Sequence, residues 1–159
     1  MSLIKHGVAA EDIYASLADD APPTDSAIIV SLARFQKDRE ALLTRNTPLG
    51  VRLKQDQPPA LLGEDVGKLS LIVYEFTAFR DGRPFSYARA LRTRLGFTGE
   101  LRAEGKYLYD QIAFLIRVGF DAFDLPTAIT PELFACATQE MRHVYQPAAD
   151  GRKTIRDLR

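Results

Sequence analysis

The chain has 159 residues, a length typical of one domain, and a domain of this size buries roughly 68–70% of its unfolded surface. Lys+Arg and Asp+Glu both number 21, so the formal net charge is zero, which argues against the strongly basic surface of a nucleic-acid-binding domain. The apolar runs are far shorter than the roughly 20 residues that span a bilayer, and the N-terminal residues lack the apolar region of a signal peptide. We therefore predict a cytoplasmic protein with neither a nucleic-acid nor a membrane partner.

Changes in composition divide the chain into three segments. Residues 1–26 are predicted to form an N-terminal arm, residues 27–146 a single α/β domain, and residues 147–159 a flexible, polar C-terminal tail. Within the arm, residues 10–17 have the pattern of a short helix, which two consecutive prolines then end. A β-hairpin beginning at residues 3–8 is the alternative for the start of the arm, and the sequence leaves this choice open.

The central segment predicts five β-strands, of which the first is a continuous apolar run, typical of a strand that is covered on both faces. The predicted strands are residues 27–32, 49–53, 69–76, 99–103 and 120–125. Between and after these strands, apolar residues recur with the spacing of a helix face. The predicted helices are residues 35–44, 85–95, 107–118 and 131–144, with a further helical turn within residues 61–68.

Alternation of strands and helices indicates βα units, and therefore a parallel sheet of about five strands. The favoured arrangement is an open, half-barrel-like sheet, similar to half of a TIM barrel, with helices on one face. The alternative is a flavodoxin-like three-layer sandwich with helices on both faces. A half-barrel would leave apolar residues on its concave face, and a second copy of the chain could cover them in a homodimer.

Both arrangements predict that a ligand site would lie at the carboxyl ends of the strands. Arg83 and Arg102 suit an oxyanion such as sulfite, sulfate or phosphate, because a guanidinium binds oxyanions through two hydrogen bonds. Glu75 is either a base or a partner that positions an arginine. The competing interpretation is that these residues form ion pairs that order the loops. The candidate oxyanion-site residues are Glu75, Arg80, Asp81, Arg83, Arg102 and Asp124.

The sequence predicts no cofactor and no metal. Cys136 is the only cysteine, so no disulfide forms within the chain and no Cys-x-x-Cys pair exists for zinc or an iron–sulfur cluster. Its place on an apolar helix face predicts a buried side chain. Only two histidines are present, one near each end, and no glycine-rich phosphate-binding motif occurs. Whether the protein is an enzyme is left open.

One pattern of residues resembles a known family. It consists of residues 75–83 (EFTAFRDGR), Ser86, 88–89 (AR), 91–92 (LR), 99–103 (GELRA), 110–111 (DQ) and 119–123 (GFDAF). This pattern closely resembles the bacterial domain-of-unknown-function family nine-three-four, and a weaker likeness extends over the whole chain. The chain departs from its relatives at residues 106–109 (KYLY), where they tend to have an acidic residue and an arginine.

The resemblance implies a setting among genes of assimilatory sulfite and sulfate reduction, where members are often labelled as oxidoreductases. Sulfite reduction uses sirohaem and an iron–sulfur cluster held by cysteine thiolates, and a chain with one cysteine cannot hold such a cluster. The first hypothesis is therefore a non-catalytic accessory or assembly protein that binds sulfite reductase, or another sulfur-assimilation protein, through residues 76–92. The alternative is a small oxyanion- or nucleotide-binding enzyme with its site at the strand ends.

Overall fold

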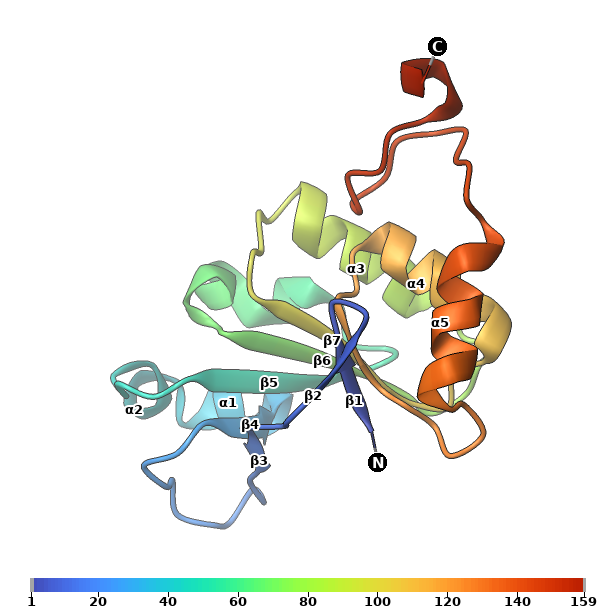
Figure 1. The fold of residues 1–159 in the computed structure, drawn as a ribbon. Coiled ribbons are helices and arrows are strands. Elements are labelled where there is room, and N and C mark those ends of the chain that lie inside the picture. Colours follow the sequence, from blue (N-terminus) through green and yellow to red (C-terminus); the bar gives the residue numbers. More distant parts are fainter. Residues whose placement is uncertain (1, 159) are drawn as a thin grey trace.

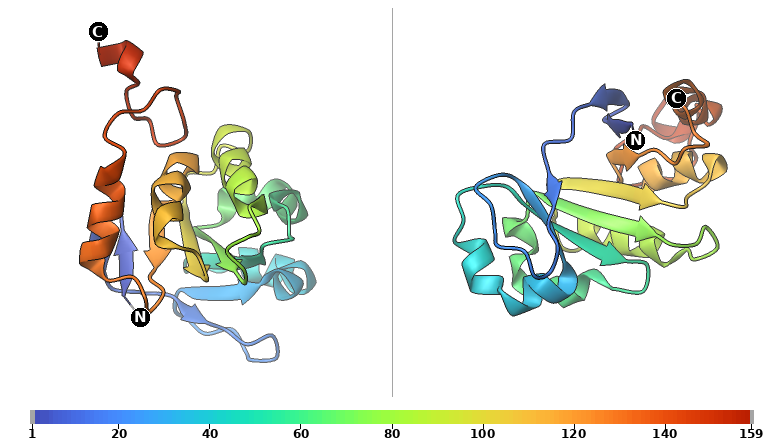
Figure 2. Two further views of the ribbon diagram at one scale, coloured as in Figure 1. Left: turned by 90° about the vertical axis from the view of Figure 1, so that its right-hand side faces the viewer. Right: turned by 90° about the horizontal axis from the view of Figure 1, so that it is seen from below.

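A computed structural model describes residues 2–158 as a curled, open sheet of eight strands with helices against its convex face (Figure 1, Figure 2). The strand order is β2-β1-β8-β7-β6-β5-β4-β3. The strands are β1 (Leu3–Lys5), β2 (Val8–Ala10), β3 (Ala15–Ser16), β4 (Ile28–Ser31), β5 (Leu49–Lys54), β6 (Leu71–Phe76), β7 (Glu100–Gly105) and β8 (Ala122–Asp124). The five strands predicted from the sequence are β4 to β8, and β1 to β3 are additional.

The pairing of the strands distinguishes between the two predicted folds. Strands β3 to β8 are parallel and neighbour one another in chain order, whereas the strand order of a flavodoxin-like sheet reverses along the chain. Within residues 2–158, the antiparallel pairings of the sheet are those of β1 with β2 and of β1 with β8. The structure is thus the predicted half-barrel, and the flavodoxin-like alternative is wrong.

Most of the helices connect parallel strands. The helices are α1 (Leu32–Lys37), α2 (Arg39–Leu43), η1 (Pro59–Lys68), α3 (Arg83–Thr93), η2 (Tyr109–Gln111), α4 (Ile112–Val118), α5 (Pro131–Glu140) and η3 (Ile155–Leu158). Helices α5 and η3 follow the last strand. The single helix predicted for residues 35–44 is instead two short helices that meet at Asp38. The first begins earlier than predicted because the Ser31 hydroxyl accepts a hydrogen bond from the Arg34 amide and caps it.

The helix predicted for residues 10–17 is wrong. This segment is extended and ends in β3 at the edge of the sheet, where the Ala15 amide donates to the Ala27 carbonyl (3.0 Å) and the Leu17 amide to the Ile29 carbonyl (2.9 Å). We call residues 11–17 the strap. The strap follows the β1–β2 hairpin, which is the alternative that the sequence left open, and it crosses to the far edge of the sheet (Figure 2).

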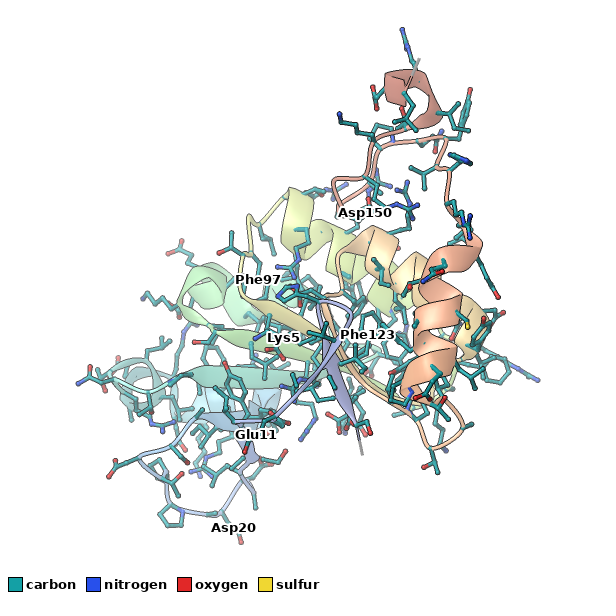
Figure 3. The ribbon with its side chains drawn as sticks, in the orientation of Figure 1. Lys5, Glu11, Asp20, Phe97, Phe123 and Asp150 are labelled. Atoms are coloured by element: carbon teal, nitrogen blue, oxygen red, sulfur yellow. The ribbon has the colours of Figure 1, made fainter. Side chains whose placement is uncertain are left out.

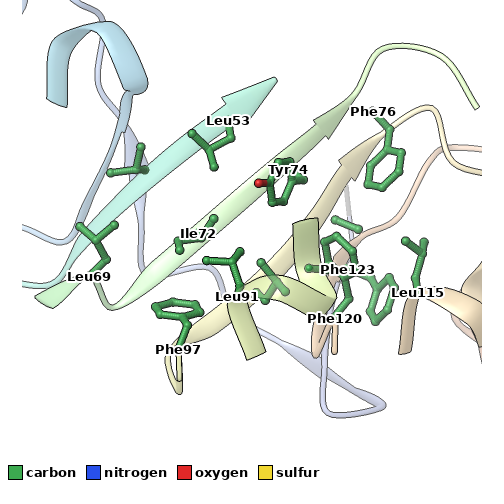
Figure 4. Packing of buried hydrophobic residues seen from close by; sticks show 14 of the residues in the cluster. Leu53, Leu69, Ile72, Tyr74, Phe76, Leu91, Phe97, Leu115, Phe120 and Phe123 are labelled. Carbon is green, nitrogen blue, oxygen red and sulfur yellow. The ribbon is translucent and has the colours of Figure 1, made fainter. Parts of the chain in front are cut away.

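The main core lies between the sheet and the helices. Because side chains alternate along a strand, Ile72, Tyr74 and Phe76 of β6 all point to the helices, where Phe120 and Phe123 pack beside them (Figure 4). The same alternation makes Leu71 and Val73 face the concave side of the sheet.

On the concave face, Leu71, Val73 and Ile29 form a small apolar cluster, against which Tyr14 of the strap packs. All three aliphatic residues are buried within the single chain. The sequence predicted that a second copy of the chain could cover apolar residues on the concave face. In the structure, the strap of the same chain already covers these three residues.

The C-terminal segment extends away from the sheet (Figure 1, red). Within it, Val144 pairs with Thr154, and the Arg117 side chain of α4 binds the Asp150 carboxylate at 3.0 Å. The structure corrects one prediction on α5: Cys136 is exposed, because Phe134 and Ala137 form the buried side of this helix and Cys136 lies off that side.

Candidate functional site

The concave face carries a network of ion pairs on neighbouring strands. Glu100, Arg102 and Glu104 of β7 alternate with apolar residues, so that all three point to this face. Glu100 accepts from Lys5 of β1 at 2.8 Å, and Glu104 accepts from Arg52 of β5 at 3.0 Å. Figure 3 labels Lys5 on β1, and it also labels Glu11, where the strap begins. Three strands and the strap therefore share one charged surface.

Arg102 is the centre of this network, with a side chain that is only 4% exposed. Its guanidinium binds both carboxylate oxygens of Asp12 in the strap, at 2.6 and 3.1 Å, and it also binds Glu100 at 2.8 Å. Burial opposes the charged form of both Arg102 and Asp12, but their mutual hydrogen bonds prevail, raising the pKa of Arg102 and lowering that of Asp12. The predicted oxyanion ligand of Arg102 is therefore replaced by a carboxylate of the same chain.

The structure also corrects the position of Arg102 along the sheet. Strand β7 extends to Gly105, two residues beyond the predicted end, so Arg102 lies in the middle of the strand and not at its carboxyl end. Asp81 lies in the loop after β6 and binds Arg83, the first residue of α3, with Nη2 and Oδ2 2.6 Å apart. Arg80 of the same loop stacks over the Phe79 ring at 5.5 Å. The six candidate residues therefore do not converge on one oxyanion.

The carboxyl ends of the central strands are acidic instead. Glu75 of β6 is paired in register with Glu104 of β7, and Asp124 ends the neighbouring β8. Burial, followed by the nearby negative charge of Glu104, raises the pKa of Asp124. A shallow cavity of about 290 Å³ opens here between Glu104, Lys106 and Asp124. These carboxylates would repel an anion at this end of the sheet.

Two glutamine side chains hold the loops that follow β6 and β7. The buried Gln55 amide, just after β5, accepts from the Thr77 and Ala78 amides, both at 2.9 Å, and donates to the Ala78 carbonyl at 2.6 Å. Gln111 donates to the Phe79 carbonyl at 2.9 Å and accepts from the Leu108 amide at 3.0 Å. One side-chain amide therefore bridges the backbones of Phe79 and Leu108, which belong to two different loops.

Phe79 and Leu108 each leave 43% of their surface exposed to solvent. We call Phe79, Arg80 and Leu108 the rim patch, because they lie beyond the carboxyl ends of the strands. The hydrogen bonds of Gln111 join the backbones of the two apolar residues, and Arg80 adds a positive charge over the Phe79 ring. Apolar residues held in this way beside an arginine have the composition of a protein-contact surface.

A second cavity, of about 490 Å³, lies at the opposite end of the sheet and is lined in part by His6, Arg92 and Asp121. Arg92 donates to the Asp121 carboxylate at 2.7 Å and to the backbone carbonyls of Phe97, Gly99 and Gly119. Burial raises the pKa of Asp121, while a hydrogen bond from the Leu101 amide opposes this shift. The polar groups of Arg92 and Asp121 thus satisfy one another and order the surrounding loops.

Sequence reasoning did not single out Asp12, Tyr14 or Gln55. Asp12 and Tyr14 lie in a segment whose pattern resembles a helix, and only the pairing of β3 with β4 brings them over the sheet. Gln55 lies in a polar loop with no motif. The position of Gln55 could have marked it as a site residue, because it lies just after a predicted strand. Side chains at such positions reach the loop that follows the next strand.

The fold and these contacts define the protein as a small α/β half-barrel with an ion-paired concave face and an exposed rim patch. The model of a bacterial protein family of unknown function, DUF934, matches residues 50–156, and the chain therefore belongs to this family. No curated protein matches the chain. Across residues 2–158, none of the helices has both the length and the apolar character that crossing a bilayer requires.

Proposed function

We propose that the protein is a cytoplasmic, non-catalytic accessory protein of assimilatory sulfite and sulfate reduction that binds a protein of this system through the rim patch. The pathway comes from the family resemblance, and sulfite reductase or another sulfur-assimilation protein is the proposed partner. A homodimer stays a prediction, for which the covered concave face offers no further support.

The rim patch is the observation that supports binding to a protein. Phe79 and Leu108 are exposed, yet the loops that carry them are held by Gln55 and Gln111 through their backbones. A surface that is ordered before binding loses little conformational entropy when a partner arrives. Because Phe79 belongs to the segment that carries the family resemblance and Leu108 lies where the chain departs from its relatives, the two sides of the patch need not contribute equally.

The pairing of the arginines favours this proposal over an oxyanion- or nucleotide-binding enzyme. Arg83 and Arg102 are both bound to carboxylates of the same chain, and the strand ends between them carry Glu75, Glu104 and Asp124. An anion that bound there would have to displace these carboxylates or approach them. Loss of the ion pairs of the arginines and repulsion by the carboxylates both oppose tight binding of a small oxyanion.

Growth of a strain that lacks the gene tests the proposal. We expect normal growth on sulfide but poor growth on sulfite and sulfate, with rescue by the wild-type gene and not by the Phe79→Ser/Leu108→Ser variant. Leu95→Ser is the matched control, because Leu95 is 45% exposed and follows α3 at the opposite end of the sheet. Normal growth of the deletion strain on sulfate would contradict the pathway assignment.

The amounts of the variant proteins are compared by immunoblot, so that loss of protein is separated from loss of binding. A defective deletion strain that the rim variant rescues fully would leave the pathway assignment in place. It would show that the rim patch is not the contact surface.

A further inference from the structure

The strap binds the sheet as an extended peptide would bind it. Its residues Ala15 and Ser16 pair in parallel with Ile28 and Ile29 at the edge of the sheet, and the Ala15 and Leu17 amides make the hydrogen bonds described above. Addition of one strand to an exposed edge is a common way in which domains recognise peptides, with backbone hydrogen bonds giving affinity and side-chain contacts giving specificity.

Three side chains of the strap make contacts that depend on its sequence, and one of them, the Ser16 hydroxyl, accepts from Arg52 at 3.0 Å. The Asp12 carboxylate binds the Arg102 guanidinium through both oxygens. Tyr14 packs against the cluster of Ile29, Leu71 and Val73, and the Arg102 guanidinium lies 5.7 Å from the centre of its ring. An acidic residue and an aromatic residue two positions later therefore account for the contacts with Arg102 and with the apolar cluster.

Within the network of ion pairs around Arg102, Asp12 supplies the last anion. Lys5, Arg52 and Arg102 carry three positive charges in this network, while Glu100 and Glu104 carry two negative charges, which leaves a net charge of +1 before Asp12 is counted. Asp12 brings this sum to zero. A segment that replaced the strap without supplying an acid would leave Arg102 with an unbalanced charge in a largely buried position.

The strap is held at few points. Strand β3 has only two residues, the Asp12 side chain is 41% exposed, and Ile13 is 66% exposed. Exposed segments with few buried contacts open at a low free-energy cost compared with the central strands of a sheet. Release of the strap is therefore expected to require less free energy than unfolding of the half-barrel.

From these contacts we infer that the groove between β4 and Arg102 is a binding site for an extended segment of another protein, with the strap as its occupant in the free protein. The segment has an aspartate or glutamate followed two residues later by a tyrosine or phenylalanine. It adds to the edge of β4, binds Arg102 through its carboxylate and covers Leu71 and Val73 with its ring. The strap is released in exchange.

Binding of a synthetic peptide of residues 9–19 (AAEDIYASLAD) to the full-length chain tests this inference by fluorescence anisotropy. The Asp12→Asn/Tyr14→Ala protein has a weakened strap and an intact groove, so we expect it to bind the peptide at least tenfold more tightly than the wild type does. Ile13→Ala is the matched control and should behave as the wild type. A peptide with the same two substitutions as the weakened strap should lose this binding.

Lack of peptide binding by the folded double variant at millimolar concentration would overturn the inference. If that variant does not fold, amide hydrogen exchange of the wild-type chain decides instead. Excess peptide should accelerate exchange at the chain's own Ala15 and Leu17 amides at least tenfold, while exchange in β6 stays unchanged. Unchanged exchange at Ala15 and Leu17 would assign the strap a purely structural role.

Two further outcomes would assign the groove to another ligand and so overturn the inference. Release of the strap by sulfate or succinate, but not by the peptide, would define a site for small anions. Concentration-dependent dimerisation of the wild type, with exchange of straps between copies, would make a second copy the natural occupant. None of these measurements involves the rim patch, so the outcome is independent of the proposed function.

Discussion

Replacement of Arg102 by methionine should destabilise the protein strongly, although the long side chain is kept. Glu100 would lose its buried partner, and its side chain is only 5% exposed. The half-exposed Asp12 would lose its partner as well. Lys5 would still bind Glu100, at 2.8 Å in the native structure. The effect therefore depends mainly on one carboxylate left without its buried guanidinium.

The burial of each group sets the size of the effect. Removal of one partner of a buried ion pair costs about 3–5 kcal/mol, and the remaining contact of Glu100 with Lys5 places our expectation near the lower end, at about 3 kcal/mol. The contact with Asp12 adds less than about 1 kcal/mol, because exposed pairs are screened by water. A second substitution, Glu100→Gln, removes the isolated charge and should restore about 2 kcal/mol, because replacing both partners avoids an unpaired buried ion.

Urea unfolding followed by circular dichroism measures both variants against the wild type. We expect the order of stability to be wild type, then Arg102→Met/Glu100→Gln, then Arg102→Met. A loss below about 0.5 kcal/mol for the single variant, within the usual range of surface substitutions, would refute a buried network at Arg102. A double variant no more stable than the single variant would refute the assignment of the cost to Glu100.

Three further predictions follow from single residues. Gln55→Ala should cost about 2 kcal/mol in urea unfolding, because the buried Gln55 amide makes several hydrogen bonds that hold residues 77–78. Gly105→Ala should destabilise by more than about 1 kcal/mol, because φ is +96° and a Cβ would lie 2.5 Å from a carbonyl oxygen, whereas Gly67→Ala, with open space, should not. The pKa of Asp12 is lowered in the folded chain, so strap protection in hydrogen exchange should be constant above about pH 4 and lost as pH falls through the folded pKa.

Strands β4 to β8 were predictable from their apolar residues and their alternation with helices, whereas β3, which is also parallel, was predicted as part of a helix. The turn and helix after β6 were also predictable from Asp81-Gly82 and the helical spacing that follows. The helices with one apolar side were compatible with both predicted arrangements, and the structure confirms the half-barrel that was favoured.

The strap could not be predicted, because its structure depends on a partner distant in sequence. Ile13 and Leu17 are four residues apart, as on a helix face, yet the segment is extended because it pairs with the edge of β4. Once Asp12 was expected on a helix in the arm, nothing in the sequence indicated that it would bind Arg102, which lies 90 residues away. The error at Arg102 arose from the end of β7, because a strand end shifted by two residues moved this side chain from the rim to the centre of the concave face.

Direct binding between this protein and purified sulfite reductase of the same cell tests the central proposal. We predict a saturable interaction that the Phe79→Ser/Leu108→Ser variant weakens at least tenfold, about 1.4 kcal/mol of binding free energy, and that Leu95→Ser leaves unchanged. Absence of binding by the wild type up to about 100 μM, a range that includes weak specific complexes, would contradict sulfite reductase as the partner. Equal binding by the wild type and the rim variant would contradict the role of Phe79 and Leu108.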